Sequence, residues 1–182
     1  MSEHPSITRF RTVLTDLGGQ GRIVVLPGAV HTAALAAEAL GCEVGAIANS
    51  LLFEASTQGW DEQPAEHSEH AKPAEHSEHS EHAEPVLVLT SGAHRVDTAK
   101  VAADLGLSRL RRASARFVRE HTGQVIGGVS PIGHPRPVRT YIDPTLREYE
   151  EVWAAAGHPA AVFSTTYDEL LAMTHAQEIE VN

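Results

Sequence analysis

Strand-like and helix-like segments alternate along this chain, and their order restricts the possible folds more than any other feature does. Short apolar runs predict strands, and apolar residues at helical spacing, several followed by a glycine stop, predict helices. The alternation is no regular βαβ repeat, and the glycine-rich 124–134 segment lacks the G-x-G-x-x-G spacing of a dinucleotide-binding turn. We therefore predict an α/β or α+β domain around a mixed sheet, and not a Rossmann fold. The expected helices are 7–19, 31–41, 96–106, 147–157 and 166–176, and the expected strands are 22–28, 44–55, 86–92, 138–146 and 160–165, with 124–134 a strand that breaks into a loop.

One segment, residues 60–85, differs from the rest because it is acidic, histidine-rich and nearly without large apolar residues after Trp60. It contains the repeat PAEHSEH at 64–70 and again at 73–79. Such a composition buries too little apolar surface to offset the entropy of ordering, so we predict a flexible loop inserted in a single domain, 1–182. Its histidines are spaced by three residues, with one step of six between His70 and His76, and could bind a transition metal if the segment ordered. The simpler interpretation is a solvated polar loop, and no metal or other cofactor is predicted for the domain.

The net charge of −10 does not exclude a nucleic-acid partner, because most of it lies in that loop. Residues 60–85 hold eight acidic residues against one lysine, which leaves the rest of the chain at only −3. No apolar run is long enough for a membrane span, so none is predicted. The N-terminal segment has no basic region followed by an apolar stretch, and the single cysteine, Cys42, cannot form an internal disulfide. These features predict a cytoplasmic protein.

A pair of polar residues, Asn49 and Ser50, interrupts the apolar strand predicted at 44–55. A buried strand cannot leave two hydrogen-bonding side chains unpaired without a cost in stability. One interpretation is a local kink in which their polar atoms bond the neighbouring backbone. The other is the floor of a pocket, in which both residues contact a ligand.

The arginine-rich stretch at 108–123 is the candidate region for contact with nucleic acid. On a helix, Arg112, Arg116 and Arg119 would share one face and could follow a row of phosphates. A solvated helix face is the alternative. Five of the fourteen basic residues lie within eleven positions of this stretch: Arg109, Arg111, Arg112, Arg116 and Arg119.

Several blocks of the sequence, in a characteristic order, carry a resemblance to a known family: AAEALGCEVGAIANSLLFE, LVLTSGAHRVDTAKVAADLG, FVREHTGQVIGGVSPIGH, WAAAGHPAAVF and TYDELL. The chain resembles the YbaK/EbsC family of aminoacyl-tRNA editing domains, the free-standing relatives of the insertion domain of bacterial prolyl-tRNA synthetase. The resemblance covers residues 5–176 apart from the histidine-rich loop. It implies a mixed, partly barrel-like sheet flanked by helices, and an enzyme that hydrolyses wrongly charged tRNA in trans, most often tRNA for proline. The acceptor end of tRNA is then the partner, with an aminoacyl-tRNA synthetase as a further candidate.

The resemblance also implies a site made of one strand and one loop. The strand is the one that holds Asn49 and Ser50, and the loop has the form G-x-x-x-P, here Gly127 to Pro131. Glycines let backbone approach a ligand closely, and their N–H groups can face a developing oxyanion, although an ordinary glycine turn is the alternative. The candidate catalytic residues are Asn49, Gly127, Gly128 and Ser130, and the candidate substrate-binding residues in these segments are Ser50 and Pro131.

Two histidines are further candidates for substrate binding. His134 could orient a water or the terminal adenosine, and His158 lies near the position of a pocket histidine in the synthetase-embedded relatives. A capping or surface role for His134, and helix termination at His158, are the alternatives. No Ser-His-Asp grouping is legible, and an aminoacyl ester is activated enough for a positioned water and oxyanion donors to suffice.

Three positions depart from the pattern of the family. Most members have a lysine where this chain has Asn49. The branch that acts on cysteinyl-tRNA for proline has a serine and an aspartate at positions that align with Ala155 and Val162. The resemblance therefore implies a different branch with a different acyl pocket. A non-catalytic module that binds aminoacyl-tRNA or an amino-acid-like ligand, and a metal-buffering protein that uses the loop, are the competing interpretations.

Overall fold

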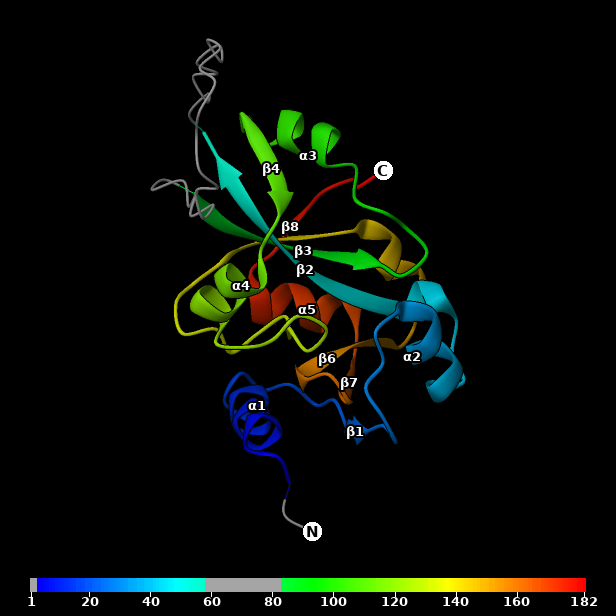
Figure 1. The fold of residues 1–182 in the computed structure, drawn as a ribbon. Helices are drawn as coiled ribbons and strands as arrows, with labels where there is room; N and C mark the ends of the chain where they lie inside the picture. Colours follow the sequence, from blue (N-terminus) through cyan, green and yellow to red (C-terminus); the bar gives the residue numbers. More distant parts are fainter. Residues whose placement is uncertain (1–2, 58–82) are drawn as a thin grey trace, which may run out of the picture.

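The computed structural model describes residues 3–57 and 83–182, which build one mixed sheet with helices packed on it (Figure 1). The order across the sheet is β1-β7-β6-β2-β3-β5-β8, with β4 paired to β2 beside this path. The predicted mixed sheet flanked by helices is confirmed, and its strands form an open path rather than a closed barrel. The helices are α1 (Pro5–Asp16), α2 (Ala33–Leu40), α3 (Thr98–Asp104), α4 (Ala115–Thr122) and α5 (Tyr167–Thr174), with the short 3-10 turns η1 (Val44–Ala46) and η2 (Pro144–Glu148). The strands are β1 (Ile23–Val25), β2 (Ile47–Ser56), β3 (Glu84–Ser91), β4 (Arg109–Arg112), β5 (Arg139–Ile142), β6 (Val152–His158), β7 (Ala161–Thr165) and β8 (Gln177–Glu178).

Strand β2 organises the sheet because three strands pair with it. Along one edge it pairs with β3, antiparallel, over nearly its whole length. Along the other edge it pairs with β6 at Ile47 and Ala48, and with β4 only from Phe53 onward. In Figure 1, β6 lies beside the start of β2 and β4 lies beside its arrowhead. Between Asn49 and Leu52, no strand of the described chain covers this edge.

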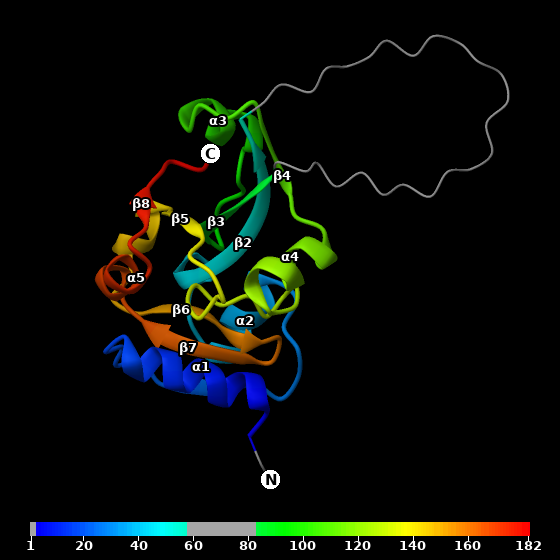
Figure 2. The same ribbon diagram turned by 90° about the vertical axis from the view of Figure 1, so that its left-hand side faces the viewer.

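The two faces of β2 contact different parts of the core, since successive side chains of a strand point to opposite faces. Ala48 and Leu52 belong to the largest cluster, which includes buried side chains of α1, α4 and α5. Ile47 packs in a cluster with α2, and Phe53 in one with α3. Figure 2 shows α1 along β6 and β7, at the end of the molecule away from α3. Ser50 therefore projects toward the largest cluster, and the residue before it toward the face that α2 and α3 cover.

The end signals of the second helix are confirmed. The Thr32 hydroxyl accepts a hydrogen bond from Leu35 N at 3.2 Å, and Gly41 ends the helix in the left-handed region at φ 69°. Helices also form in the predicted ranges 7–19, 96–106 and 166–176, and strands overlap the predicted ranges 22–28, 44–55, 86–92, 138–146 and 160–165.

The helix predicted over 147–157 is wrong, because most of this segment is the strand β6. Its residues include good helix formers, but the segment lies between two neighbouring strands. Its apolar side chains, Trp153 among them, are buried in the core on the two faces of the sheet. The ladder to β7 and the contact with β2 outweigh an intrinsic propensity of less than 1 kcal/mol per residue. Two smaller corrections concern 44–46, which forms η1 rather than the start of a strand, and 124–134, which contains no strand.

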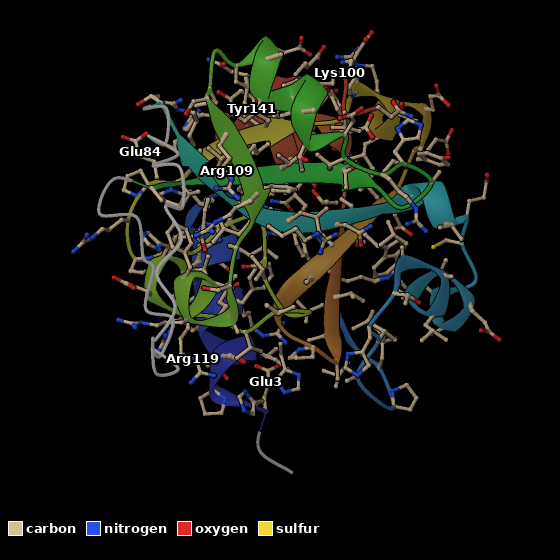
Figure 3. All side chains as sticks on the ribbon, turned by 45° about the horizontal axis from the view of Figure 1, so that its top comes forward. Glu3, Glu84, Lys100, Arg109, Arg119 and Tyr141 are labelled. Carbon is tan, nitrogen blue, oxygen red and sulfur yellow. The ribbon has the colours of Figure 1, made fainter. Side chains whose placement is uncertain are left out.

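The arginine-rich stretch forms two elements, so the common helical face predicted for its arginines is wrong. Arg112 is the last residue of β4, and Ser114 caps α4 by accepting a hydrogen bond at 3.2 Å from a backbone N–H of the first turn. Arg116 and Arg119 alone lie on the helix, where both are exposed. Figure 3 shows Arg109 on the strand and Arg119 near the helix. The serine was the sequence signal for this boundary, because serine is a preferred N-cap residue.

The loop predicted at 60–85 lies largely outside the described residues. Strand β2 ends at Ser56 and β3 begins at Glu84, so the last two residues of the predicted loop belong to β3. The flexibility and the metal binding predicted for the loop concern undescribed residues and stay predictions. Within 3–57 and 83–182, no helix combines the length and the hydropathy needed to cross a bilayer.

Candidate active site

A cavity of about 250 Å³ lies against the edge of β2 that no described strand covers. Its walls come from the start of α2, from β2, from the junction of β4 and α4, from the loop after α4, and from the β6–β7 hairpin. Most of the lining is small and apolar, with alanine as its commonest residue. The polar and charged lining residues are His31, Thr32, Asn49, Ser50 and Arg112.

The cavity forms where β2 has stopped pairing with β6 and has not yet begun to pair with β4. The C=O of Leu89 accepts a hydrogen bond from Asp143 N, so the peptide groups of Leu89 point toward β5 and not toward β2. Ser50 is the residue opposite Leu89 in the antiparallel ladder, and its own N–H and C=O therefore point to the other edge. At that edge, pairing with β6 has ended and pairing with β4 has not begun. The main chain at Ser50 thus presents a donor and an acceptor to the cavity.

The Ser50 hydroxyl is the strongest sign that the cavity receives a polar ligand. Its Oγ is the one buried side-chain nitrogen or oxygen, in the part of the chain that the structure describes, without a hydrogen-bond partner. Leaving a buried hydroxyl unpaired costs roughly 1–3 kcal/mol. A ligand with a donor or an acceptor at this point would remove that cost.

Asn49 lines the same cavity from the opposite face of β2. Its side chain is half-buried and makes no hydrogen bond to a described residue. Neither Asn49 nor Ser50 uses its side chain to bond the neighbouring backbone, so the geometry favours the pocket interpretation over the local kink.

The loop after α4 packs against the β6–β7 hairpin, and its two glycines differ in function. Gly127, at φ 86°, lines the cavity, and its N–H donates to no described residue. Gly128 N–H is already used, because it donates to Val125 O at 2.9 Å. A Cβ on Gly128 would lie 2.9 Å from the carbonyl carbon of His158 and from two atoms of Pro159, so the close packing here requires glycine. Of the two glycines, only the first can offer its N–H to a ligand.

Ser130 and Pro131 are buried behind that loop and do not line the cavity. The Ser130 hydroxyl donates to Ile132 O at 2.6 Å and accepts a hydrogen bond from Gln124 Nε2 at 2.9 Å. Ser130 N donates to Gln124 Oε1 at 2.7 Å. Because these bonds fix the loop, the geometry favours a scaffold role for Ser130 over the predicted catalytic one.

The two candidate histidines also lie outside the lining. His134 Nε2 donates to Ser130 O at 2.9 Å, and burial lowers the pKa of this imidazole below its ordinary value, which keeps the ring neutral at pH 7. His158 Nδ1 accepts a hydrogen bond from Ala160 N at 3.1 Å within the hairpin, while the adjacent Pro159 does line the cavity. Both histidines support the walls from behind, and a contact of either with substrate stays a prediction.

The three positions at which the resemblance implies a departure from the family pattern, Asn49, Ala155 and Val162, all line the cavity. Ala155 and Val162 are directly opposite each other in the β6–β7 ladder, and both line the wall. This apolar pair offers no hydrogen bond to a ligand side chain. Sequence reasoning did not single out Trp153, Val118 or His31, which also line the cavity, because nothing local distinguishes them from core or surface residues.

The cavity carries hydrogen-bond donors but no activated nucleophile. Ser50 Oγ has no hydrogen-bond partner in the described part of the chain, and hence no base beside it there. Among the described residues, no group of three or more His, Cys, Asp or Glu side chains is placed to hold a metal ion. Such a site can bind and orient an ester and a water through donors and shape.

The fold and the cavity define a small α/β domain whose cavity is lined by mostly small apolar residues, with a few polar groups and one arginine. The family model described as an aminoacyl-tRNA editing domain matches residues 27–173. A solved structure, described provisionally as a trans-editing enzyme for prolyl tRNA synthetase, is 38% identical, with a TM-score of 0.79 and coverage of 100% of this chain and 99% of that one. The chain belongs to the aminoacyl-tRNA editing domain family, and the resemblance to the YbaK/EbsC family is confirmed.

Two curated relatives fit this assignment. The proline–tRNA ligase of Limosilactobacillus fermentum is 32% identical over 66% of this chain and 17% of the ligase. EbsC of Enterococcus faecalis, described provisionally as a Cys-tRNA(Pro)/Cys-tRNA(Cys) deacylase, is 25% identical over 53% of this chain and 59% of EbsC. The chain thus spans less than two thirds of either relative.

Proposed function

We propose that the protein is a trans-editing hydrolase that deacylates mischarged aminoacyl-tRNA in the cytoplasm, with a tRNA for proline as its substrate. Membership of the editing family supports the hydrolase activity, and the similarity to a structure described as a trans-editing enzyme for prolyl tRNA synthetase supports the choice of tRNA. The observation that carries the proposal is the cavity at the uncovered edge of β2, where the Ser50 hydroxyl has no partner.

The chemistry needs positioning more than a strong nucleophile, because the aminoacyl ester is already activated. Water attacks the ester carbonyl carbon, the bond from that carbon to the ribose oxygen breaks, and that oxygen takes up a proton from the water to become the ribose hydroxyl as the free amino acid leaves. We assign the N–H groups of Ser50 and Gly127 to the developing oxyanion. The Ser50 hydroxyl then holds the ester or the attacking water.

The residues that line the cavity restrict which amino acid can be removed from the tRNA. Ala155 and Val162 form an apolar surface, so a neutral acyl side chain fits there better than a charged one. Asn49 contributes an amide at the other face of β2, where it bonds an oxygen of the ester or of the ribose.

The helix α4 connects the cavity with a surface suited to RNA. Its Val118 lines the cavity, while Arg116 and Arg119 are exposed and form no ion pair with a described residue. Exposed arginines next to the cavity match the phosphates of the acceptor stem. A synthetase that delivers the mischarged tRNA is a further partner under this proposal.

The direct test is a deacylation screen of several mischarged prolyl and alanyl tRNAs with the purified protein. Release of the amino acid from at least one of them, above the uncatalysed rate, is the expected result. Tight binding without release from any would leave a non-catalytic module in place of the enzyme.

Ser50→Ala should lower kcat/KM about tenfold to a hundredfold without lowering the Tm. The hydroxyl has no partner among residues 3–57 and 83–182, so its removal withdraws a bond from the substrate complex and none from the described fold. Thermal unfolding and single-turnover deacylation measure the two effects.

Ser91→Ala is the matched control for that variant. The Ser91 side chain is fully buried, and its Oγ donates to Gly45 O at 2.8 Å. This variant should lose about 1–3 kcal/mol of unfolding free energy and keep its kcat/KM. A Ser50→Ala protein that is destabilised and fully active would show that the hydroxyl serves the fold.

Asn49→Lys should lower kcat/KM at least tenfold, and Asn49→Ala by about tenfold. The alanine removes a donor and an acceptor. The lysine adds a half-buried cation to an apolar cavity that Arg112 already lines, which disfavours the charged state. The measurement is kcat/KM at two ionic strengths. Higher activity with stronger salt dependence for the lysine variant would contradict a pocket built around a neutral amide.

A further inference from the structure

Arg112 is the only formally charged side chain among the described residues that line the cavity. It is exposed, and its guanidinium makes no ion pair or hydrogen bond to a residue in 3–57 or 83–182. The adjacent Arg111 differs, since its Nε and Nη2 donate to Glu54 Oε2 at 2.9 and 2.6 Å. Of two neighbouring arginines, one is engaged by the fold and the other is available to a ligand.

The register of β4 on β2 directs these two arginines to opposite faces. Arg111 is opposite Glu54, and Arg112 is opposite Phe53. Side chains of directly opposed residues share a face, and residues two apart on a strand share it as well. Arg112 therefore lies on the face of β2 that carries Asn49, at the end of the uncovered edge where β4 begins.

The charges around the cavity make Arg112 an anion-binding group. The other polar lining residues are neutral or, in the case of His31, an imidazole, so no lining carboxylate neutralises the guanidinium. Phe53 and Asn49 are separated along β2 by about 13 Å, at roughly 3.3 Å per residue. Because the long arginine side chain spans part of this separation, a ligand held at Asn49 and Ser50 would meet the guanidinium with a group about one ribose away from its ester.

The substrate supplies one anion at that distance. In an aminoacyl ester of the terminal adenosine, the ester is neutral, the amino group carries positive or no charge, and the nearest permanent anion is the phosphate on the 5′ oxygen. A guanidinium suits it because its planar N–H groups bind two phosphate oxygens together. Resting on the proposed function, we propose that Arg112 binds the 5′-phosphate of the terminal adenosine. It is a positioning residue that fixes the ester at the uncovered edge of β2.

The test compares adenosine 5′-monophosphate with adenosine as probes, because they differ only in this phosphate. The parent protein should bind the monophosphate about tenfold more tightly than the nucleoside, as measured by NMR titration at low salt. In Arg112→Gln this preference should disappear, and Arg112→Lys should retain part of it. Arg9→Gln is the matched control, because Arg9 is exposed on α1 and does not line the cavity. It should keep the full preference.

Deacylation gives a second readout, in which Arg112→Gln should raise KM about tenfold and change kcat little. Equal binding of the two probes to the parent protein, or no binding of either at millimolar concentration, would overturn the assignment. So would a loss of activity confined to esters of acidic amino acids, which would mean that Arg112 contacts the acyl side chain. A phosphate preference that depends on Arg112 in a protein that hydrolyses no tRNA would refute the hydrolase and leave the phosphate site standing.

Discussion

A Gly128→Val variant is expected to remain folded but to lose about a hundredfold in kcat/KM. A Cβ at this position would meet backbone atoms of His158 and Pro159 at 2.9 Å, and valine adds two methyl groups beyond it. The loop must then move away from the β6–β7 hairpin, and Gly127 moves with it. A displacement of about 1 Å in a positioning group can cost roughly a hundredfold in rate, while overpacking costs about 1–3 kcal/mol in stability.

The measurement is kcat/KM for deacylation beside the free energy of unfolding in urea. Gly28→Val is the matched control, because a Cβ at Gly28 meets no atom within 4 Å and its φ is not positive. This control should keep both quantities. If the Gly128 variant were as active as the parent, the loop would not form part of the working site.

The second large effect concerns stability. Arg111→Met should lower the free energy of unfolding by about 3 kcal/mol, because it leaves the Glu54 carboxylate, which is 5% exposed, without its cation. For a chain of this length, that loss corresponds to a fall in Tm of about 6–12 °C. Glu54 also accepts a hydrogen bond from Ser114 N at 3.2 Å, so the same carboxylate joins β2, β4 and the start of α4.

A surface control and a double variant test whether the unpaired buried charge causes this loss of stability. Arg139→Met breaks a surface pair with Glu84 and should cost less than about 1 kcal/mol. Glu54→Leu/Arg111→Met removes both charges and should recover part of the stability lost in Arg111→Met, since a buried charge is no longer left unpaired. If Arg111→Met and Arg139→Met unfold at the same urea concentration, the buried pair is not a major support of the fold.

Local sequence signals were sufficient to predict those features that depend on residues only a few positions apart, such as the ends of helices. Thr32 and Gly41 bound α2 as their side-chain oxygen and missing Cβ predict. Helix α5 follows Thr166, which accepts a hydrogen bond from Glu169 N. The polar pair at Asn49 and Ser50 was legible for the same reason, since two hydrogen-bonding groups in an apolar strand are anomalous without any knowledge of their neighbours.

Long-range pairing decided the elements that the sequence did not reveal. The 147–157 segment includes good helix formers, yet residues 152–157 belong to β6, because pairing with β2 and β7 holds them in the sheet. Arg112 was predicted to lie on the same helix as Arg116. Pairing with β2 instead places it in strand β4, and the helix begins only after its N-cap residue, Ser114. Pairing with β2, whose contacting residues lie more than fifty positions away in the chain, contributes to both errors.

In the candidate site, too, some features could be predicted from the sequence and others only from the tertiary structure. By itself, the sequence determined the family through several blocks in a characteristic order, and the polar pair and the glycine loop through consecutive residues. Only the tertiary structure decided that the Ser50 hydroxyl is left unpaired, that Ser130 is used by its own loop, and that Arg112 lines the cavity while Arg111 is bound to Glu54. The physical reason is that the cavity exists only where pairing with β6 has ended and pairing with β4 has not begun, and no local sequence pattern specifies where two distant strands leave the edge of a third.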